Sequence, residues 1–456
     1  MFVNRSDELA RLEAWWNRRD GSLAVVWGRR RVGKTALLQH FAADRPTVFH
    51  TAGGRPAGDE LQALSRAAAP LAGGSARDLA TRPFADWDDA LETLATAAAS
   101  RRLLLVLDEW PALVETSPEL PTLLRAAWDR LRGRTKLKVV LSGSAVRTME
   151  AMQEERSPLY GRLDLALLLH PFRPHEAALM LPRLSPPHRA LVWGLVGGMP
   201  LYLRWWDQDV GVRSNLARLA CTPGGPLLTE GQLVLATEAD GGDLARQVLY
   251  AIAAGRTKFN EIQDAVRADP GRTLDRLVAL RLIERLVPVT EDPRRTRRRV
   301  YRIADNFLAF WLGLLDRYRP EIERGLGTSI LPVLIRSLDD HMGVPWEQAF
   351  RDHLRRRAAA GELGDVVAIG PFWTSGPDPG EIDAVALAGR GREAVLLGEA
   401  KWAKRAKAAP LVAGLRRKAL ALPRLADEPR YAVAARERVD GPDDVLAITA
   451  ADVFGA

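Results

Sequence analysis

The eight residues GRRRVGKT, from Gly28 to Thr35, constrain the fold of this chain more than any other segment. They match the pattern G-x-x-x-x-G-K-[ST], in which glycines let backbone N–H groups turn toward phosphate oxygens. The apolar run LAVVW precedes the pattern directly, and the helical pattern TALLQHFAA overlaps its end. A strand, a phosphate-binding loop and a helix in this order predict an α/β domain with a parallel sheet that binds a nucleotide.

Within the loop, Lys34 is expected to reach the β- and γ-phosphates of ATP, and the hydroxyl of Thr35 is expected to ligate Mg²⁺. The alternative is a glycine-rich turn that carries a lysine by chance. The helix that follows would present its positive N-terminal end to the same phosphates. The residues predicted to contact ATP here are Gly28, Arg29, Arg30, Arg31, Val32, Gly33, Lys34, Thr35 and Ala36.

An acidic pair follows the next apolar run, in the sequence LLLVLDE. A buried strand that delivers two carboxylates at its carboxyl end suits phosphoryl transfer with Mg²⁺. Asp108 would then hold the metal, and Glu109 would polarise the attacking water. A solvated acidic loop is the alternative interpretation.

Two further residues are candidates for the γ-phosphate. Ser142 ends a third apolar run and would face this phosphate between the other two strands, or it would only cap a turn. Arg162, in RSPLYGR, would stabilise negative charge in the transition state, or it is an ordinary surface arginine.

Together these motifs resemble the archaeal-type ATPase family, a branch of the STAND class of P-loop ATPases related to AAA+ proteins. The resemblance rests on the opening residues Asn4, Arg5 and Glu8, on GRRRVGKT and LLLVLDEW, and on LSGSAVRTM, PLYGR and GGMPLYL. It covers roughly residues 1–235. It implies that the three opening residues lie near the nucleotide base and that GGMP belongs to a helical lid.

A second unit is expected after the turn sequence PGGP. Helical patterns at residues 243–254, 258–266 and 272–280 precede two strand-like runs around the tip EDPRRTRR, which is the order of a winged helix. Residues 243–303 contain 14 Arg and Lys against 8 Asp and Glu. A DNA-binding wing, a solvated loop and a packing module all remain open. The arginines at this tip are Arg294, Arg295, Arg297, Arg298 and Arg299.

The C-terminal part resembles two known patterns. Asp383, followed by Glu399 and Lys401 in the sequence EAK, resembles the PD-(D/E)xK nuclease pattern, and strand alternation puts the last two on one face. Asp383 and Glu399 would hold Mg²⁺, Lys401 would orient the attacking water, and Glu347 would supply a further acidic ligand. The segment YRIADNF resembles YRLxDPF of the DUF234 domain, with Asn306 in place of the usual proline.

Composition sets the remaining limits. The net charge of +8 favours a nucleic-acid partner, although 57 of the 65 basic residues are arginine, as a GC-rich genome would also produce. The single cysteine, Cys221, excludes an internal disulfide. The longest uncharged apolar stretch, residues 190–203, has 14 residues, fewer than the about 18 needed to span a bilayer. We expect a cytoplasmic protein without membrane contact, and its oligomeric state stays open.

The sequence therefore predicts an α/β chain with three domains: a P-loop ATPase domain with a helical lid (1–235), a winged-helix domain (236–320) and a small restriction-endonuclease-like α/β domain (321–456). ATP hydrolysis with Mg²⁺ would control engagement or cleavage of nucleic acid, with DNA the favoured partner. One alternative is a nucleotide-dependent switch that binds a protein partner through an inactive nuclease fold. The other is a DNA-binding regulator that uses the arginine-rich wing.

Overall fold

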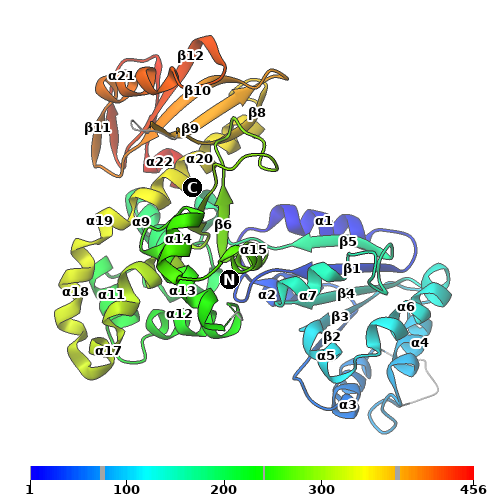
Figure 1. Cartoon of the computed structure of the whole chain (residues 1–456). Coiled ribbons are helices and arrows are strands. Elements are labelled where there is room, and N and C mark those ends of the chain that lie inside the picture. Colours follow the sequence, from blue (N-terminus) through cyan, green and yellow to red (C-terminus); the bar gives the residue numbers. More distant parts are fainter. Residues whose placement is uncertain (1, 72–77, 240–241, 375–379, 456) are drawn as a thin grey trace. The chain divides into compact units, whose positions relative to one another are not determined.

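The computed structural model describes residues 2–71, 78–239, 242–374 and 380–455. The chain divides into two compact units, Met1–Pro171 and Phe172–Ala456 (Figure 1). The predicted domain boundaries at residues 235 and 320 both fall inside the second unit, so they stay a prediction.

The first unit is built on the predicted parallel sheet, which has five strands. They are β1 (Ser22–Trp27), β2 (Thr47–Thr51), β3 (Leu103–Asp108), β4 (Leu137–Gly143) and β5 (Leu163–Leu168), in the spatial order β2-β3-β4-β1-β5. All residues of β1, β3 and β4 are buried, as expected of strands covered on both faces. Because β4 lies between β1 and β3, its carboxyl end separates the phosphate loop from the acidic pair.

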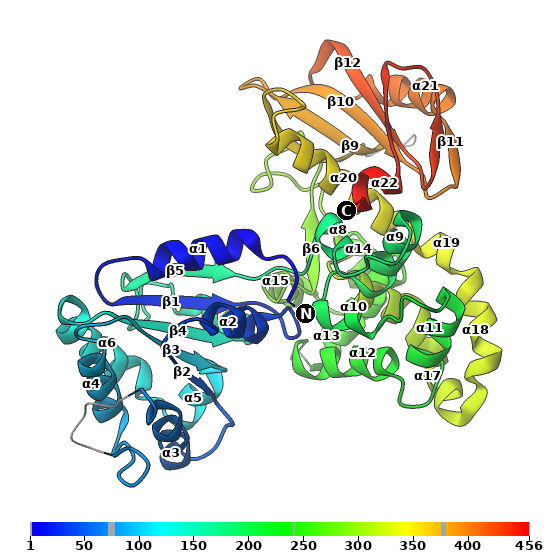
Figure 2. The ribbon, with the colours of Figure 1, turned by 180° about the vertical axis from the view of Figure 1, so that it is seen from behind.

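Helices cover both faces of this sheet, and Figures 1 and 2 view it from opposite sides. The helices α1 (Ser6–Trp16) and α2 (Lys34–Ala42) lie on one face. The other face is covered by α3 (Ala57–Ala68), α4 (Trp87–Ala97), α5 (Trp110–Thr116), α6 (Leu120–Leu131) and α7 (Val146–Ala151). Alternate strand residues such as Leu103, Leu105 and Leu107 form one core with this second group of helices.

The second unit begins with helices and a short hairpin. Its first helices are α8 (Pro174–Ala178), α9 (Pro186–Val196), α10 (Pro200–Trp205), α11 (Val212–Leu219) and α12 (Pro226–Thr237). Then come α13 (Gly242–Ala253), α14 (Phe259–Val266) and α15 (Gly271–Ala279), followed by the antiparallel strands β6 (Ile283–Leu286) and β7 (Val300–Ile303). Three helices and a hairpin are thus present in the predicted order, and the winged-helix assignment itself stays a prediction.

A further helical stretch connects the hairpin to the C-terminal sheet. It comprises α16 (Asn306–Phe310), which continues as a π-helix over Trp311–Leu315, then α17 (Arg319–Glu321), α18 (Gly327–Arg336), α19 (Leu338–His341) and α20 (Gly343–Ala359). The indole N–H of Trp311 donates to the carbonyl of Leu228 in α12 at 3.0 Å. This contact anchors the stretch to the helices before it.

The C-terminal sheet is mixed. Its strands are β8 (Val366–Trp373), β9 (Glu381–Ala388), β10 (Glu393–Ala400), β12 (Leu425–Ala434) and β14 (Val445–Ile448), in the order β14-β12-β10-β9-β8. The strands β8, β9 and β10 pair antiparallel, whereas β12 pairs parallel with both of its neighbours. The remaining elements are β11 (Arg405–Lys407), α21 (Ala408–Ala419), β13 (Arg438–Asp440) and α22 (Ala450–Phe454).

The two faces of this sheet pack against different helices. On one face, a Cβ at Gly398 would lie 2.6 Å from the ring of Phe350, so glycine is required where α20 crosses β10. On the other face, Leu415 of α21 packs with Val385 and Leu397. Val385, Leu387 and Leu397 therefore face α21.

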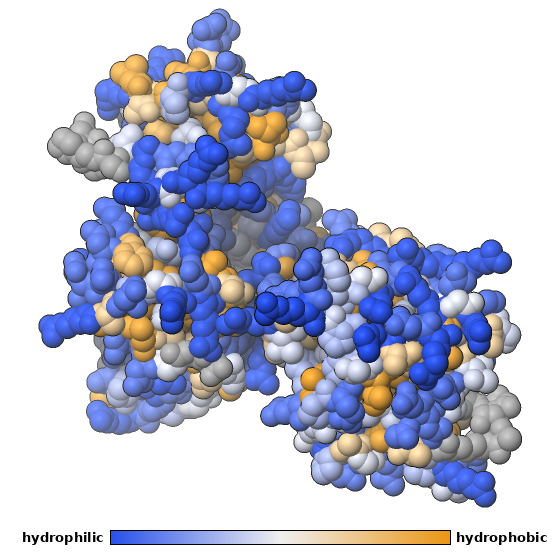
Figure 3. All heavy atoms as spheres, turned by 45° about the vertical axis from the view of Figure 1, so that its right-hand side comes forward, coloured by the Kyte–Doolittle hydropathy of each residue, from blue (hydrophilic) through white to orange (hydrophobic). Residues whose placement is uncertain are grey.

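The surface seen in Figure 3 is mostly hydrophilic, with apolar side chains in small separate patches. Among the described residues, no helix is both long and apolar enough to cross a bilayer.

Candidate functional site

The loop after β1 has a backbone that requires glycine at two positions. Gly28 has φ +154°, and a Cβ there would lie 2.5 Å from the carbonyl oxygen of Leu169. Gly33 has φ +97° and directly precedes α2. Both are the glycines of the phosphate-binding pattern, so the loop has the tight turn that the pattern predicts.

The Lys34 side chain folds back over this loop. Its Nζ donates to the carbonyl oxygens of Gly28 at 3.0 Å and Arg29 at 3.2 Å, and the residue is buried. The ammonium group therefore lies against the loop where phosphate oxygens would bind, as expected for this lysine.

The hydroxyl of Thr35 donates to Oδ2 of Asp108 at 2.8 Å. This bond joins the start of α2 to the end of β3 and brings together two motifs that are 73 residues apart. Asp108 is 1% exposed, and its Oδ1 has no hydrogen-bond partner among the described residues. Hydroxyl and carboxylate oxygens suit Mg²⁺, which commonly takes one or two carboxylates together with substrate phosphates.

Ser142 lies near the end of β4, which is the strand between β1 and β3, and it is fully buried. Its Oγ also lacks a partner within the described part of the chain. A buried polar atom without a hydrogen bond costs about 1–3 kcal/mol. Two such oxygens at one edge of the sheet are consistent with a site that a nucleotide and its cation complete.

Glu109 follows Asp108 directly and adopts φ +54°, an uncommon backbone for a residue other than glycine. The Ser144 hydroxyl donates to its Oε2 at 3.1 Å. This turn directs the half-buried Glu109 carboxylate toward Ser144 in the loop after β4, two residues beyond Ser142. The acidic pair is thus divided: Asp108 faces Thr35 and Glu109 faces the end of β4.

The opening residues lie beside the loop. The guanidinium of Arg5 donates to the carbonyl oxygens of Val32 at 3.0 Å and His170 at 2.9 Å, and it pairs with Glu8 at 2.8 Å. Asn4 and Arg5 both have positive φ, 59° and 71°. Arg5 thereby fixes this segment to the phosphate loop, and its predicted proximity to the base stays a prediction.

A second polar cluster lies on the face of the C-terminal sheet that packs against α21. The register pairs Gly398 with Ala384 and thus puts Glu399 opposite Asp383 on neighbouring antiparallel strands. Each of these two acids is 7% exposed. Lys401 follows two residues later, on the same side, and its Nζ lies 2.7 Å from Oε1 of Glu399.

A lysine from α21 completes this cluster. The Nζ of Lys418 lies 3.0 Å from Oε2 of Glu399, so both carboxylate oxygens of Glu399 have a lysine partner. The backbone N–H of Ala400 donates to Asp383 at 2.8 Å. Burial raises the pKa of Asp383, and the charge of Glu399 adds to this upward shift although the Ala400 hydrogen bond opposes it.

Glu347, predicted as a further ligand, lies close enough to Asp383 and Lys401 for their charges to interact. Burial and then the charge of Asp383 raise the pKa of Glu347, while Arg351, at 3.6 Å, lowers it. No group of three or more His, Cys, Asp or Glu side chains suited to a metal ion occurs among the described residues. Asp383 and Glu399, together with Glu347, stay the predicted ligands of a cation at this cluster.

Known proteins resemble both parts of the chain. Residues 2–205 match a family described as an ATPase domain predominantly from Archaea, and residues 311–411 match DUF234, described as Archaea bacterial proteins of unknown function. The Uncharacterized ATP-binding protein MJ0423 of Methanocaldococcus jannaschii is 49% identical over 45 residues, which span 10% of this chain and 76% of that protein. This chain belongs to the archaeal-type P-loop ATPases with a C-terminal DUF234 domain.

Two longer matches extend over more of the chain. The Uncharacterized protein MJECL04 of M. jannaschii is 26% identical over 414 residues, 88% of each chain. The solved Walker-type ATPase PABY2304 of Pyrococcus abyssi is 21% identical, with a TM-score of 0.52, over 68% of this chain and 96% of that one. At this identity the structural likeness shows the fold alone, and membership of the STAND class stays a prediction.

In this ATPase, Arg162 lies away from the phosphate loop, contrary to the role expected from the sequence. It precedes β5, whose first residue, Leu163, pairs with Leu23 near the start of β1. The loop follows the other end of β1, about 20 Å away at the rise of a strand. Both Nε and Nη2 of Arg162 donate to the carboxylate of Asp129 at 2.8 Å. Arg162 therefore has no place in the chemistry proposed for its own chain.

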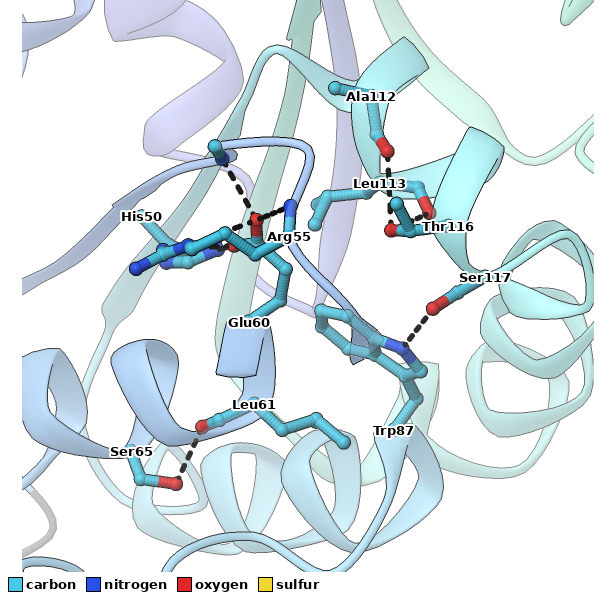
Figure 4. Close-up of polar contacts among 11 residues, drawn as sticks. His50, Arg55, Glu60, Leu61, Ser65, Trp87, Ala112, Leu113, Thr116 and Ser117 are labelled. Carbon is cyan, nitrogen blue, oxygen red and sulfur yellow. Dashed lines mark hydrogen bonds and ion pairs between the residues drawn. The ribbon is translucent and has the colours of Figure 1, made fainter. Parts of the chain in front are cut away.

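Sequence analysis missed a buried acid next to the acidic pair. Glu60 of α3 is fully buried and accepts hydrogen bonds from His50, at 2.9 Å, and from the backbone N–H groups of Gly53 and Arg55 (Figure 4). Burial acts to raise the pKa of Glu60, but the hydrogen bonds from Arg55 and Gly53 outweigh it and lower the pKa to about 2. The segment held by Glu60 reaches the site, because Ala52 N–H donates to the carbonyl of Asp108 at 3.0 Å.

Proposed function

We propose that this ATPase binds ATP with Mg²⁺ and couples its hydrolysis to the engagement or cleavage of nucleic acid by the C-terminal cluster. The observation that supports the nucleotide part best is the Thr35–Asp108 bond beside the unpartnered oxygens of Asp108 and Ser142. Mg²⁺ held by Thr35 and Asp108 would neutralise phosphate charge. The ammonium group of Lys34 would give up its hydrogen bonds to the carbonyl oxygens of Gly28 and Arg29 and donate to phosphate oxygens instead.

Glu109 is the residue proposed to act on the attacking water. It lies next to Asp108 and is oriented by the Ser144 hydroxyl. Ser142 lies between the phosphate loop and the acidic pair and would donate to the γ-phosphate. These roles separate binding from turnover.

The ATP part predicts different losses for two substitutions. Lys34→Ala should abolish ATP binding because it removes the cation at the phosphates, whereas Glu109→Gln should bind ATP normally and lose turnover by at least about 100-fold. Binding of a fluorescent ATP analogue and release of phosphate measure the two steps. Wild-type turnover in Glu109→Gln would overturn the role proposed for this carboxylate.

For the C-terminal cluster, Asp383 and Glu399 would hold a divalent cation, and Lys401 would orient water against a phosphodiester. Asp383→Ala should eliminate Mg²⁺- or Mn²⁺-dependent cleavage of plasmid or single-stranded DNA and leave ATP hydrolysis intact. A wild-type protein that binds no nucleic acid and cuts none, with or without ATP, would contradict this part.

A second candidate function is a nucleotide-dependent switch in which the nuclease-like fold only binds a protein partner. The specific observation in its favour is that Lys401 and Lys418 already neutralise both oxygens of Glu399. Under this alternative, no cleavage occurs and the affinity for the partner changes between the ATP and ADP states.

A further inference from the structure

The second unit contains a cavity of about 700 Å³ with a wall of one charge sign. It lies where the start of α14, the tip of the β6–β7 hairpin and the end of β8 come together. No Asp or Glu is among the described residues that line it. Its cationic lining residues are Lys258, Arg295, Arg297, Arg298 and Arg299. A wall of this kind attracts a polyanion such as a phosphodiester chain.

The arginines of this cavity differ in how firmly they are held. Arg298 forms an ion pair with Glu291 and also donates to the carbonyl of Trp373 at 3.3 Å. The Arg295 side chain is 89% exposed and lies 3.7 Å from Asp292. Arg297 is exposed. The last two are the side chains most available to an incoming phosphate.

Aromatic side chains stand among these cations. Phe259, the first residue of α14, is 40% exposed, and Trp373 lies half-buried at the end of β8. Single-stranded nucleic acid is typically bound by a basic groove that carries aromatic rings on which bases stack. A duplex offers no base face for such stacking.

This cavity continues toward the carboxylate cluster. A second cavity, of about 800 Å³, shares Lys258, Tyr301, Trp373 and Thr374 with the first. It extends to Glu347 and Glu381, two acids whose charges interact with that of Asp383. We call the two cavities together the arginine groove, and it leads from the hairpin tip to Glu347 and Glu381.

The cluster itself is recessed. Asp383 and Glu399 are each only 7% exposed, so a phosphodiester must enter the fold to reach them. Duplex DNA is stiff on this scale, with a persistence length of about 50 nm. A single strand bends at each nucleotide and can follow a groove into a recess.

We infer that the arginine groove binds single-stranded nucleic acid and leads it toward the Asp383–Glu399 cluster. The inference rests on the proposed function, because it names the substrate class of that same cluster. Arg295 and Arg297 hold phosphates, and Phe259 stacks on a base.

Fluorescence anisotropy of the full-length protein tests this inference. The probes are labelled single-stranded DNA and RNA of about 20 nucleotides, and the matching DNA duplex, in EDTA so that no cleavage occurs. We expect at least one single strand to bind at least about tenfold more tightly than the duplex. Phe259→Ala should weaken that binding by about 5- to 150-fold, the range for loss of one stacked base.

Charge is tested separately. Arg297→Ala should lower the slope of log affinity against log salt by about 0.7, the value for one phosphate contact to a single strand. Arg213→Ala removes another exposed arginine, from α11 outside the groove, and should leave both affinity and slope unchanged.

The outcomes separate the inference from the proposed function. Equal or tighter binding of the duplex, or wild-type affinity in Phe259→Ala, would overturn the single-strand inference even if cleavage dependent on Asp383 is observed. Absence of binding to all three probes together with absence of cleavage would overturn both.

Discussion

Replacing Glu60 with glutamine keeps the shape of a fully buried side chain and removes its charge. In the folded protein the pKa of this carboxyl is about 2, because hydrogen bonds from Arg55 and Gly53 outweigh the opposing effect of burial. Its ordinary value is 4.5. A difference of this size corresponds to about 3 kcal/mol of stability at neutral pH, at 1.36 kcal/mol per pKa unit. Glu60→Gln should lose about that amount.

The sign of the pH dependence follows from the direction of the shift. Because the folded-state pKa is depressed, the stabilisation is fully present above the unfolded-state pKa and is lost as the pH falls toward 2. The difference between wild type and Glu60→Gln should therefore shrink to about 1 kcal/mol at pH 3. Burial lowers the pKa of His50, although Glu60 acts to raise it. Protonation of His50 is therefore less favourable in the folded protein, and acidification lowers the free energy of unfolding through this residue as well.

Native-state hydrogen exchange of the full chain measures this loss in the region concerned. Peptides that cover β2 and α3 should exchange more than about 100-fold faster in Glu60→Gln at pH 7, the ratio that corresponds to about 3 kcal/mol. Asp59→Asn removes an exposed charge from the same turn of α3 and is the matched control. Exchange within about threefold of wild type in Glu60→Gln, or an equal change in Asp59→Asn, would refute the reasoning.

Two other predictions concern residues at the amino edge of the parallel sheet, opposite the edge that carries the phosphate loop. Arg162→Ala should change phosphate release by less than about twofold, because Arg162 pairs with Asp129 far from the phosphate loop; a tenfold loss would contradict this placement. Lys138 is fully buried, and burial, reinforced by Arg102, lowers its pKa to about 8. Since the unfolded chain then binds more protons between pH 8 and 10.5, the free energy of unfolding should rise with pH over this range. Urea unfolding should show this rise in wild type and not in Lys138→Met, and an identical rise in both would exclude Lys138 as its source.

The sequence was enough to expect Thr35 and Asp108 at one place because the signals for both are local and directional. Thr35 and Asp108 each follow a strand in a motif of fixed spacing, and parallel strands place such residues at one edge of a sheet. Glu60 gave no such signal, since an acid in the first turn of an amphipathic helix is usually solvated. Its spacing to Leu64 and Ala68, which share the buried face of α3, was the available indication.

Elsewhere the sequence indicated a segment but not which of its side chains would reach a site. Arg416, Arg417 and Lys418 are three consecutive basic residues in the sequence, and only the rotation of α21 over β10 directs Lys418 to Glu399. Arg162 could not be placed without knowing that a strand begins at Leu163 and runs parallel to β1. Both answers depend on tertiary geometry that a pattern of residue types does not contain.

The direction of the parallel strands has a consequence for how relatives of this chain diverge. At the amino edge of the sheet, Lys138 and the buried carboxylate of Asp164, which accepts from Leu23 N–H at 3.1 Å, support only the fold. At the carboxyl edge, Lys34, Asp108 and Ser142 lie where nucleotide chemistry is proposed. Evolution can therefore erase turnover through a few carboxyl-edge substitutions while the sheet and its helices persist. In such a lineage an intact fold would not show that the enzyme is active.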